Sequence, residues 1–521
     1  MLQAAAVFSD NMVLQRNKKI RVFGTGDTGS RITVSLDGKV ADTICRDGKW
    51  MVYLPESEAK EGLSMTVSDG NQRICFHNIA IGEVWLAGGQ SNMELELQNA
   101  DTGREILALD AEQNEWLKKI RFYYTPKVAY VGETLLEEEK KSHWELFGKE
   151  EAAKWSAVGF FYAGKLAKEL GVTVGIIGCN WGGTSASAWM SREAILENEL
   201  TRSYVEEYES ADCVKKPLEE QIRDYEDYLV YHADWEKRAA EVYAKEPMMA
   251  FDKVQEIVGV CQYPGPVNGA NFTRPYGLYE SMIQRIAPYT LAGFIYYQGE
   301  SDEHKPESYY TLFTGLIGQW RKDWMDDSLP FLLVQLPMHR YQHDLDTRSW
   351  CILREAQMKA YQTVKNTGIA VIIDCGQFHE IHPTNKIPVG ERLALQALCQ
   401  VYDKIEKKEA FGPVYRDFLY RDGGMELAFD YAQQGFVNAE GEAFSELPET
   451  LSGFELAGAD GIFYPAKAEV ISGEHKKHTL FVSAREVEEP VTARYLWTNY
   501  GEVNLFGDNG LPVAPFRTHL F

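Results

Sequence analysis

Two residues that lie far apart in the chain have the types that ester hydrolysis needs. Ser91 lies in the run Gly88-Gly-Gln-Ser-Asn-Met93, and His382 is followed by Pro383. A serine hydroxyl is a weak nucleophile at neutral pH unless a base takes its proton, and histidine is the usual base. Glu380 would orient the imidazole through Nδ1 and stabilise the imidazolium that forms. These residues predict nucleophilic acyl transfer.

The segment before Ser91 would place this serine at the end of a strand. Residues 79–87 are apolar enough for a buried strand, Gly88 and Gly89 interrupt the pattern, and Ser91-Asn92 can start a helix. The glycines allow close backbone approach, and a helix start offers free N–H groups to an anion. The G-x-S-x-G elbow does not fit, because Met93 stands where the second glycine belongs. The alternative for Ser91-Asn92 is a simple helix cap.

Four further apolar runs predict the strands of a parallel sheet, because strands buried on both faces are continuously apolar. They are residues 172–178, 291–297, 329–336 and 369–374. With residues 84–87 they give five strands, and the helix-prone stretches between them predict a doubly wound α/β domain. Such folds bind ligands at the carboxyl ends of their strands. Polar residues follow several of these ends, including Asn180 and Gln298.

The rest of the chain predicts three further parts. Residues 1–78 alternate short β-like runs with turns, which indicates an N-terminal β domain. The catalytic α/β domain would span residues 79–404, interrupted by a charged helical insertion at 194–270 that would overhang the site. Residues 405–521 return to strand-like pieces and predict a C-terminal β domain.

Composition limits the partners of the protein. The formal net charge of −24 makes nucleic acids and anionic membranes poor partners. The sequence has no apolar run long enough to cross a membrane, and no secretory signal is visible at its start. We therefore expect a cytoplasmic protein, or a periplasmic or secreted one if the sequence begins at a mature terminus. The oligomeric state has no signature in the sequence.

The run Val84-Trp-Leu-Ala-Gly-Gly-Gln-Ser-Asn-Met93 resembles the first block of the SGNH (GDSL-like) esterases, in their sialate O-acetylesterase branch. Residues 8–16 and 510–517 also match this family, so the resemblance covers nearly the whole chain. It implies a flavodoxin-like SGNH fold. The activity it implies is that of a serine esterase that removes O-acetyl groups from a carbohydrate, above all O-acetylated sialic acid. The reaction would pass through an acetyl-enzyme and need no cofactor or metal.

The resemblance also implies roles for individual residues. His382-Pro383 matches the Asp-x-His-Pro block of the family, but Glu380 replaces the usual Asp; Asp374 or a backbone carbonyl is the alternative partner of His382. The oxyanion hole would consist of the N–H groups of Ser91 and Gly183, with Gly182 as the alternative to Gly183, and of the Gln298 amide. The residues expected near the substrate are Gln90, Asn92, Trp181, Trp189, Glu300 and Arg354, where tryptophans would stack on sugar faces and the arginine would contact an acidic sugar.

Other functions fit parts of the pattern. The catalytic blocks do not encode the sugar, so acetylated plant polysaccharide such as xylan is an alternative substrate. Because Glu380 replaces the usual Asp of the family, a carbohydrate-binding protein without activity is another alternative. A metal site at residues 379–382 is disfavoured by Pro383 and by the absence of H-E-x-x-H. A glycosidase pair of Glu300 and Glu380 would leave Ser91 and His382 unexplained.

Overall fold

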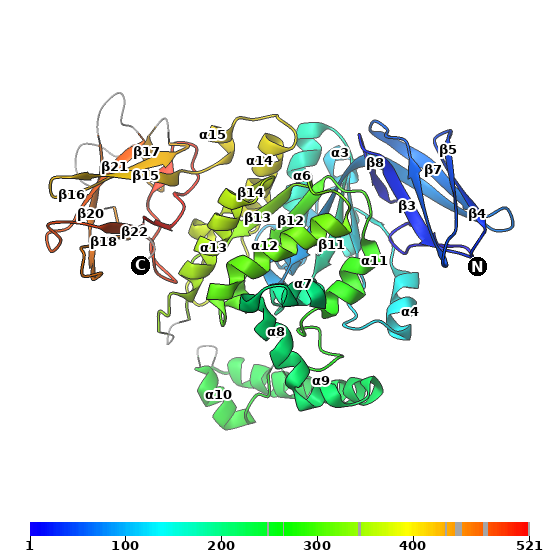
Figure 1. Ribbon diagram of the computed structural model, residues 1–521, viewed down its shortest axis with the longest axis horizontal. Helices are drawn as coiled ribbons and strands as arrows, with labels where there is room; N and C mark the ends of the chain where they lie inside the picture. The colour runs from blue at the N-terminus through cyan, green and yellow to red at the C-terminus, as the bar shows by residue number, and fades with distance from the viewer. Residues whose placement is uncertain are drawn as a thin grey trace.

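The computed structural model describes residues 1–246, 249–263, 265–341, 345–432, 435–442, 451–471 and 478–518. A large central sheet has its strands in the order β10-β9-β11-β8-β12-β13-β14 (Figure 1). The bounds of these strands are β8 Arg73–Gly89, β9 Ile120–Tyr124, β10 Glu145–Leu146, β11 Val174–Asn180, β12 Gly293–Tyr297, β13 Phe331–Gln335 and β14 Thr367–Val371. Neighbours pair in parallel from β9 to β14, and β10 pairs antiparallel with β9.

The five predicted strands lie side by side as β11-β8-β12-β13-β14, which is the flavodoxin-like order 2-1-3-4-5. The prediction of a five-stranded sheet is nevertheless wrong in number, because β9 and β10 extend one edge. β9 was missed because Arg121 interrupts its apolar pattern. Arg121 is buried and donates hydrogen bonds to the carbonyls of Asn11 and Asn78, so a charged residue serves inside the sheet.

Helices cover both faces of the sheet. Side chains alternate between the two faces of a strand, so Trp85 and Gly88 on β8 face opposite sides. The Trp85 ring packs edge-on against Tyr162 of α6 (Ala157–Leu170), whereas Gly88 lies under Trp320 of α12 (Pro306–Asp323). α14 (Ile387–Gln400) packs beside α6, and α13 (Ser349–Thr363) packs beside α12. The short helices are α1 Ser91–Glu94, α2 Gly103–Leu107, α3 Glu115–Lys118, α4 Glu133–Lys141, α5 Lys149–Ala153, α11 Gln284–Ile286 and α15 Lys407–Ala410.

β8 belongs to two sheets. Its first half pairs antiparallel with β7 (Lys60–Ser68), and its second half, Glu83–Gly89, pairs in parallel with β11. The same strand therefore runs from the N-terminal β region into the central sheet and ends at the nucleophile candidate. The boundary predicted after residue 78 falls inside this strand. The other N-terminal strands are β1 Gln3–Ala4, β2 Val13–Gln15, β3 Ile20–Thr25, β4 Arg31–Leu36, β5 Lys39–Ile44 and β6 Lys49–Leu54.

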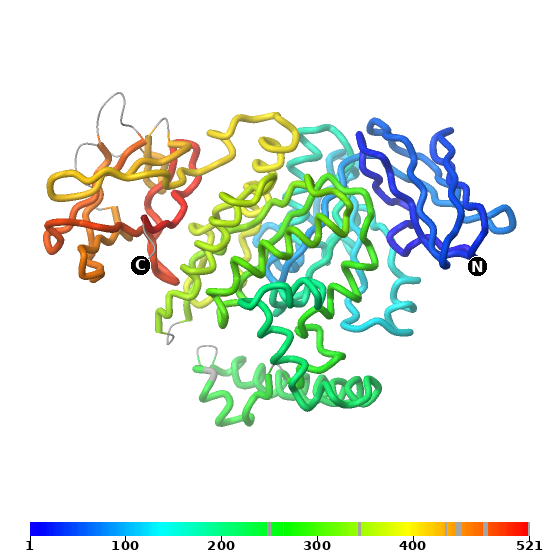
Figure 2. The backbone as a smooth tube through the Cα atoms, viewed as in Figure 1, coloured from blue at the N-terminus to red at the C-terminus, as the bar shows by residue number. Residues whose placement is uncertain are grey.

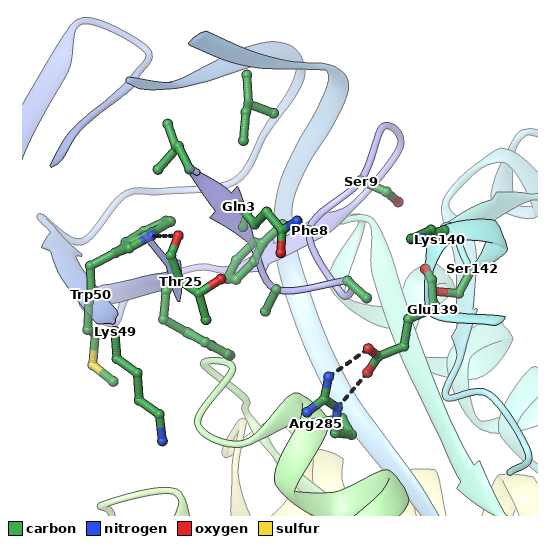
Figure 3. A pocket seen from close by; sticks show the side chains of 18 of the residues that line it. Gln3, Phe8, Ser9, Thr25, Lys49, Trp50, Glu139, Lys140, Ser142 and Arg285 are labelled. Carbon is green, nitrogen blue, oxygen red and sulfur yellow. Dashed lines mark hydrogen bonds and ion pairs between the residues drawn. The ribbon is translucent and has the colours of Figure 1, made fainter. Parts of the chain in front are cut away.

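A cleft of about 1700 Å³ separates β1, β3 and β6 from α4 and residues 284–288. Figure 3 shows Arg285 and Glu139 facing each other at one side of it, joined by two hydrogen bonds of 2.6 Å. Ser91 and His382 are not among the residues that line this cleft. The cleft therefore lies apart from the predicted catalytic groups.

The predicted insertion forms a helical projection, which lies at the lower edge of the molecule in Figure 1. Its helices are α7 Arg192–Leu196, α8 Glu199–Ser210, α9 Leu218–Tyr243 and α10 Phe251–Val258. α10 packs against α9 around a small core of Trp235, Ala239 and Val254. Within the described ranges, no helix is long and apolar enough to cross a membrane.

The C-terminal part consists of small antiparallel sheets, and Figure 2 shows the two chain ends at opposite sides of the molecule. Two four-stranded sheets have the orders β15-β16-β21-β20 and β19-β18-β22-β24, and β17 pairs with β23. The bounds are β15 Val414–Arg421, β16 Gly424–Asp430, β17 Phe436–Val437, β18 Phe454–Ala457, β19 Phe463–Pro465, β20 Lys467–Val470, β21 Thr479–Ser483, β22 Thr492–Tyr495, β23 Phe506–Gly507 and β24 Phe516–Arg517. Flanking β regions on both sides of the α/β domain agree with the predicted architecture.

Gly89 provides a test of how tightly the end of β8 is held. Its φ is +136°, and a Cβ atom there would lie 2.1 Å from the carbonyl oxygen of Tyr297. We expect Gly89→Ala to lower the free energy of unfolding by about 4 kcal/mol, because backbone strain and overlap add. Gly70→Ala is the matched control, because Gly70 also has a positive φ (+92°) but open space around it. It should cost about 1 kcal/mol.

Denaturant unfolding of both variants, followed by tryptophan fluorescence, measures this difference. Equal losses in the two variants would contradict a role for the close approach of β8 to β12.

Candidate active site

The central observation is a hydrogen bond between the two predicted catalytic side chains. Nε2 of His382 lies 2.8 Å from Oγ of Ser91, although the two residues are 291 positions apart. Ser91 follows β8, and His382 lies in the loop between β14 and α14. Both come from the carboxyl edge of the parallel strands, beside the position where the chain order reverses across β8.

The His382 imidazole is suited to accept a proton. Its side chain is 44% exposed. Burial lowers the pKa of the imidazole below its ordinary value, the charge of Glu380 raises this pKa, and the charge of Lys386 lowers it. The net direction is downward, so the ring is neutral at neutral pH and Nε2 can act as a base.

Glu380 lies near His382 but contacts a different atom from the predicted one. Its Oε1 accepts a hydrogen bond of 2.7 Å from the backbone N–H of His382 and lies 3.9 Å from Nδ1. At that distance the carboxylate acts on the ring by its charge rather than by a hydrogen bond. Asp374, the alternative partner, is held by two hydrogen bonds from Arg392 at 2.6 and 2.7 Å.

Asn92, which was predicted to lie near the substrate, is buried beside Ser91 and holds the surrounding loops. It is fully buried, and its Nδ2 donates to Oε1 of Glu300 at 2.7 Å and to the carbonyl of Ile381 at 2.9 Å. Its Oδ1 accepts a hydrogen bond of 2.6 Å from Nζ of Lys386. All polar atoms of the amide are thus engaged in holding the His382 loop beside Ser91.

Glu300 and Lys386 flank Asn92 in the interior. Burial raises the pKa of the Glu300 carboxyl, and burial lowers the pKa of the Lys386 ammonium to about 8. Glu300 is only 6% exposed and accepts a hydrogen bond from Asn92, and its contact with substrate stays a prediction. Sequence reasoning did not find Lys386. The only available signal was its position four residues after His382 on the same loop.

Of the three predicted oxyanion donors, two have a free N–H group. Among the described residues, the backbone N–H groups of Ser91 and Gly183 have no hydrogen-bond partner. The loop of Gly183 passes close to the nucleophile, since a Cβ on Gly182 would lie 3.2 Å from Cβ of Ser91. The N–H of Gly182 itself is taken by Oε2 of Glu94 at 2.5 Å, so Gly182 is not the donor.

Gln298, the third predicted oxyanion donor, has its amide engaged within the protein. This residue is buried, and its Nε2 donates both hydrogens elsewhere, to Oδ2 of Asp302 at 2.6 Å and to the carbonyl of Thr184 at 3.2 Å. Asp302 is fully buried and also accepts hydrogen bonds from Ser185 and from Tyr204 of α8. It was missed because one acid in an acidic chain has no signature in the sequence. The pair Gln298–Asp302 therefore joins the end of β12 to the loop that contains Thr184 and Ser185.

Three other predicted substrate contacts are buried and bond within the protein. Gln90 is 3% exposed, and its Oε1 accepts from the N–H groups of Gly299 and Ser301. Trp189 is fully buried, with its Nε1 bonded to Thr184. Arg354 is 1% exposed and donates to the carbonyls of Pro337 and Thr498, so it ties α13 to the C-terminal part.

Trp181 is the predicted substrate contact that stays accessible. Its side chain is half-buried and lies directly before Gly182-Gly183. Its ring stacks on Phe272 at a centroid distance of 4.7 Å and an interplanar angle of 2°. The indole is therefore held in place beside the oxyanion loop by a residue that follows the helical insertion.

Comparisons with known proteins identify carbohydrate esterases as similar to this chain. The family described as "Carbohydrate esterase, sialic acid-specific acetylesterase" matches residues 238–399. The sialate O-acetylesterase of Mus musculus is 26% identical over 459 residues, which cover 82% of this chain and 78% of that protein. The Homo sapiens enzyme of the same name is 25% identical over 456 residues, covering 79% and 73%.

One solved structure matches throughout. The crystal structure of a carbohydrate acetylesterase from Xanthomonas citri covers 100% of both chains, with a TM-score of 0.75 and 28% sequence identity. This match extends to the flanking β regions as well as to the α/β domain. The protein is thus a carboxylic ester hydrolase that resembles the sialate O-acetylesterase family over most of its length.

Proposed function

We propose that the protein is a serine acetylesterase that removes O-acetyl groups from carbohydrates. The observation that carries this proposal is the 2.8 Å hydrogen bond between Ser91 and His382, with the free N–H of Gly183 on the adjoining loop. A hydroxyl, a base and backbone donors in one place are the requirements of acyl transfer. The similar proteins, which are named as carbohydrate or sialate acetylesterases, support a carbohydrate as the substrate.

The reaction has two halves. In the first, Ser91 Oγ attacks the acetyl carbonyl while Nε2 of His382 takes the hydroxyl proton, and the N–H groups of Ser91 and Gly183 stabilise the oxyanion. The imidazolium then gives this proton to the departing sugar oxygen, which leaves acetyl on Ser91. In the second half, His382 takes a proton from water, and the resulting hydroxide attacks the acetyl carbonyl. The bond to Ser91 Oγ then breaks, acetate leaves, and the imidazolium returns a proton to Ser91.

O-acetylated sialic acid is the first candidate substrate, because the curated relatives are named for it. A neutral acetylated glycan is the second, and one observation favours it. Recognition of a sialic acid carboxylate calls for a basic side chain near the site, but three candidates are already engaged: Lys127 pairs with Glu94, Lys386 holds Asn92, and Arg354 is buried.

Loss of the nucleophile tests the proposal directly. Ser91→Ala should lower kcat/KM for p-nitrophenyl acetate by at least about 1000-fold, because the acetyl-enzyme cannot form. His382→Ala should cost a similar factor, and the double variant no more than the stronger single one, since the two side chains act as a unit. Steady-state kinetics measure all three. Turnover that persists in Ser91→Ala would refute the proposed nucleophile.

The pH dependence of kcat/KM tests His382 and Glu380 together. A neutral base predicts that kcat/KM is constant around neutral pH. It should fall at a pH below roughly 6.5, because burial depresses the pKa of the imidazole under that ordinary value. In Glu380→Gln, the raising effect of the carboxylate is lost, so the acidic limb should move to still lower pH. The amide oxygen of Gln can still accept the N–H of His382.

We also expect the plateau in Glu380→Gln to fall by more than about tenfold, because the imidazolium formed in the reaction loses a stabilising charge. A fall of less than about twofold, with an unmoved acidic limb, would mean that another group stabilises the ring.

The two candidate sugars are separated by measuring acetate release. We compare kcat/KM on O-acetylated sialic acid with that on acetylated xylan, using Ser91→Ala as the blank for each. If the site lacks a free basic side chain because Lys127, Lys386 and Arg354 are engaged, kcat/KM for acetylated xylan should be higher by at least about tenfold, which corresponds to about 1.4 kcal/mol. A preference for sialic acid of that size would establish the first candidate.

A further inference from the structure

Aromatic side chains of the helical insertion form a row that ends beside Gly183. Tyr225, Tyr228 and His232 lie three and four residues apart on α9, which places them on one face of the helix. The ring centroids of Tyr228 and His232 are 5.5 Å apart, and those of His232 and Tyr263 are 5.9 Å apart. Exposure increases along the row, from 8% at Tyr225 to 63% at Tyr263.

The packing of the insertion accounts for these rings only in part: a Cβ on Gly265 would lie 2.5 Å from the Tyr228 ring, whereas Tyr263 is 63% exposed. The small core between α9 and α10 uses Trp235, Ala239 and Val254. The neighbouring Tyr231 donates its hydroxyl to the carbonyl of Val260. By contrast, within the part of the chain that the structure describes, the hydroxyls of Tyr228 and Tyr263 have no hydrogen-bond partner. Polar ends left free beside apolar ring faces are typical of surfaces that bind sugars and other amphipathic ligands.

The row is continuous with the candidate active site. The hydroxyl of Tyr263 lies 3.3 Å from the position that a Cβ on Gly183 would take. Gly183 carries one of the two free oxyanion donors, and Trp181 stands two residues before it, stacked on Phe272. A ligand whose acetyl group reaches Ser91 would therefore have an aromatic surface next to it on the side of the insertion.

The charges around the row select a neutral ligand. Glu236 lies four residues after His232 on the same face of α9, and its Oε1 lies 3.7 Å from Nδ1 of His232. This carboxylate, on a chain of net charge −24, would repel an anionic glycan.

We propose that Tyr228, His232 and Tyr263, together with Trp181, form a binding surface for the neutral sugar units that flank the acetylated one. The substrate is then an acetylated oligosaccharide or polysaccharide rather than a single sugar. This inference rests on the proposed carbohydrate acetylesterase activity and adds the substrate class. Sugar rings offer apolar C–H faces that stack on tyrosine and tryptophan, and their hydroxyls can meet the free tyrosine hydroxyls.

The test compares acetylated xylohexaose, acetylated methyl xyloside and p-nitrophenyl acetate as substrates of the full-length protein. In the wild type, KM for the acetylated hexaose should be at least about tenfold below KM for the acetylated monosaccharide. Tyr263→Ala and Tyr228→Ala should each raise KM for the hexaose about fivefold while kcat on the hexaose changes less than about twofold, since stacking contributes to binding along the chain. Tyr263→Phe, which keeps the ring, should stay within about threefold of the wild-type KM.

Tyr53→Ala is the matched control, because Tyr53 is 50% exposed on β6 in the N-terminal part; it should leave all three substrates unaffected. Equal KM values for hexaose and monosaccharide in the wild type would overturn the binding surface and leave the esterase intact. The same holds if the tyrosine variants lower kcat on p-nitrophenyl acetate, which would place these rings in the chemistry instead. Failure of the wild type to release acetate from any sugar, with p-nitrophenyl acetate still cleaved, would overturn the proposed function itself.

Discussion

The amide of Asn92 is the interaction on which the geometry of the site depends. It holds three segments at once, because it donates to Glu300 after β12 and to Ile381 after β14, and accepts from Lys386 at the start of α14. Asn92 itself follows Ser91. The distance between nucleophile and base is therefore set by one buried side chain whose hydrogen-bonding capacity is fully used.

A second buried polar group organises the other half of the site. Asp302 accepts hydrogen bonds from Gln298, Ser185 and Tyr204, so it joins the end of β12, the oxyanion loop and helix α8 of the insertion. The family blocks thus divide their work. Asn92, Gln298 and Glu300 hold the loops together through buried hydrogen bonds, whereas the N–H groups of Ser91 and Gly183 have no partner among the described residues and Trp181 stays accessible.

The strands of the sheet and the pairing of Ser91 with His382 could be predicted from the sequence better than the roles of the other polar residues near the site. Continuous apolar runs located five strands, because burial on both faces leaves that pattern, but β9 was hidden by the buried Arg121. The pairing of Ser91 with His382 was predicted because strand ends of a parallel sheet meet at one edge. Whether a polar residue near a strand end faces substrate or interior depends on tertiary packing, which a one-dimensional pattern does not contain. Gln298 and Arg354 are examples, because both are buried and their donors bond within the protein.

β8 has a consequence for how the molecule can change shape. One strand of 17 residues serves the N-terminal sheet and then delivers Ser91, and it carries a bulge at Asn78, where φ is +54° and the register with β7 shifts. A movement of the N-terminal sheet can be absorbed at this bulge, whereas a movement of residues 79–89 would carry the nucleophile with it. The helical insertion, in contrast, is connected to the α/β domain through loops. Motion on substrate binding and sequence variation can therefore concentrate in the insertion while Ser91 stays fixed.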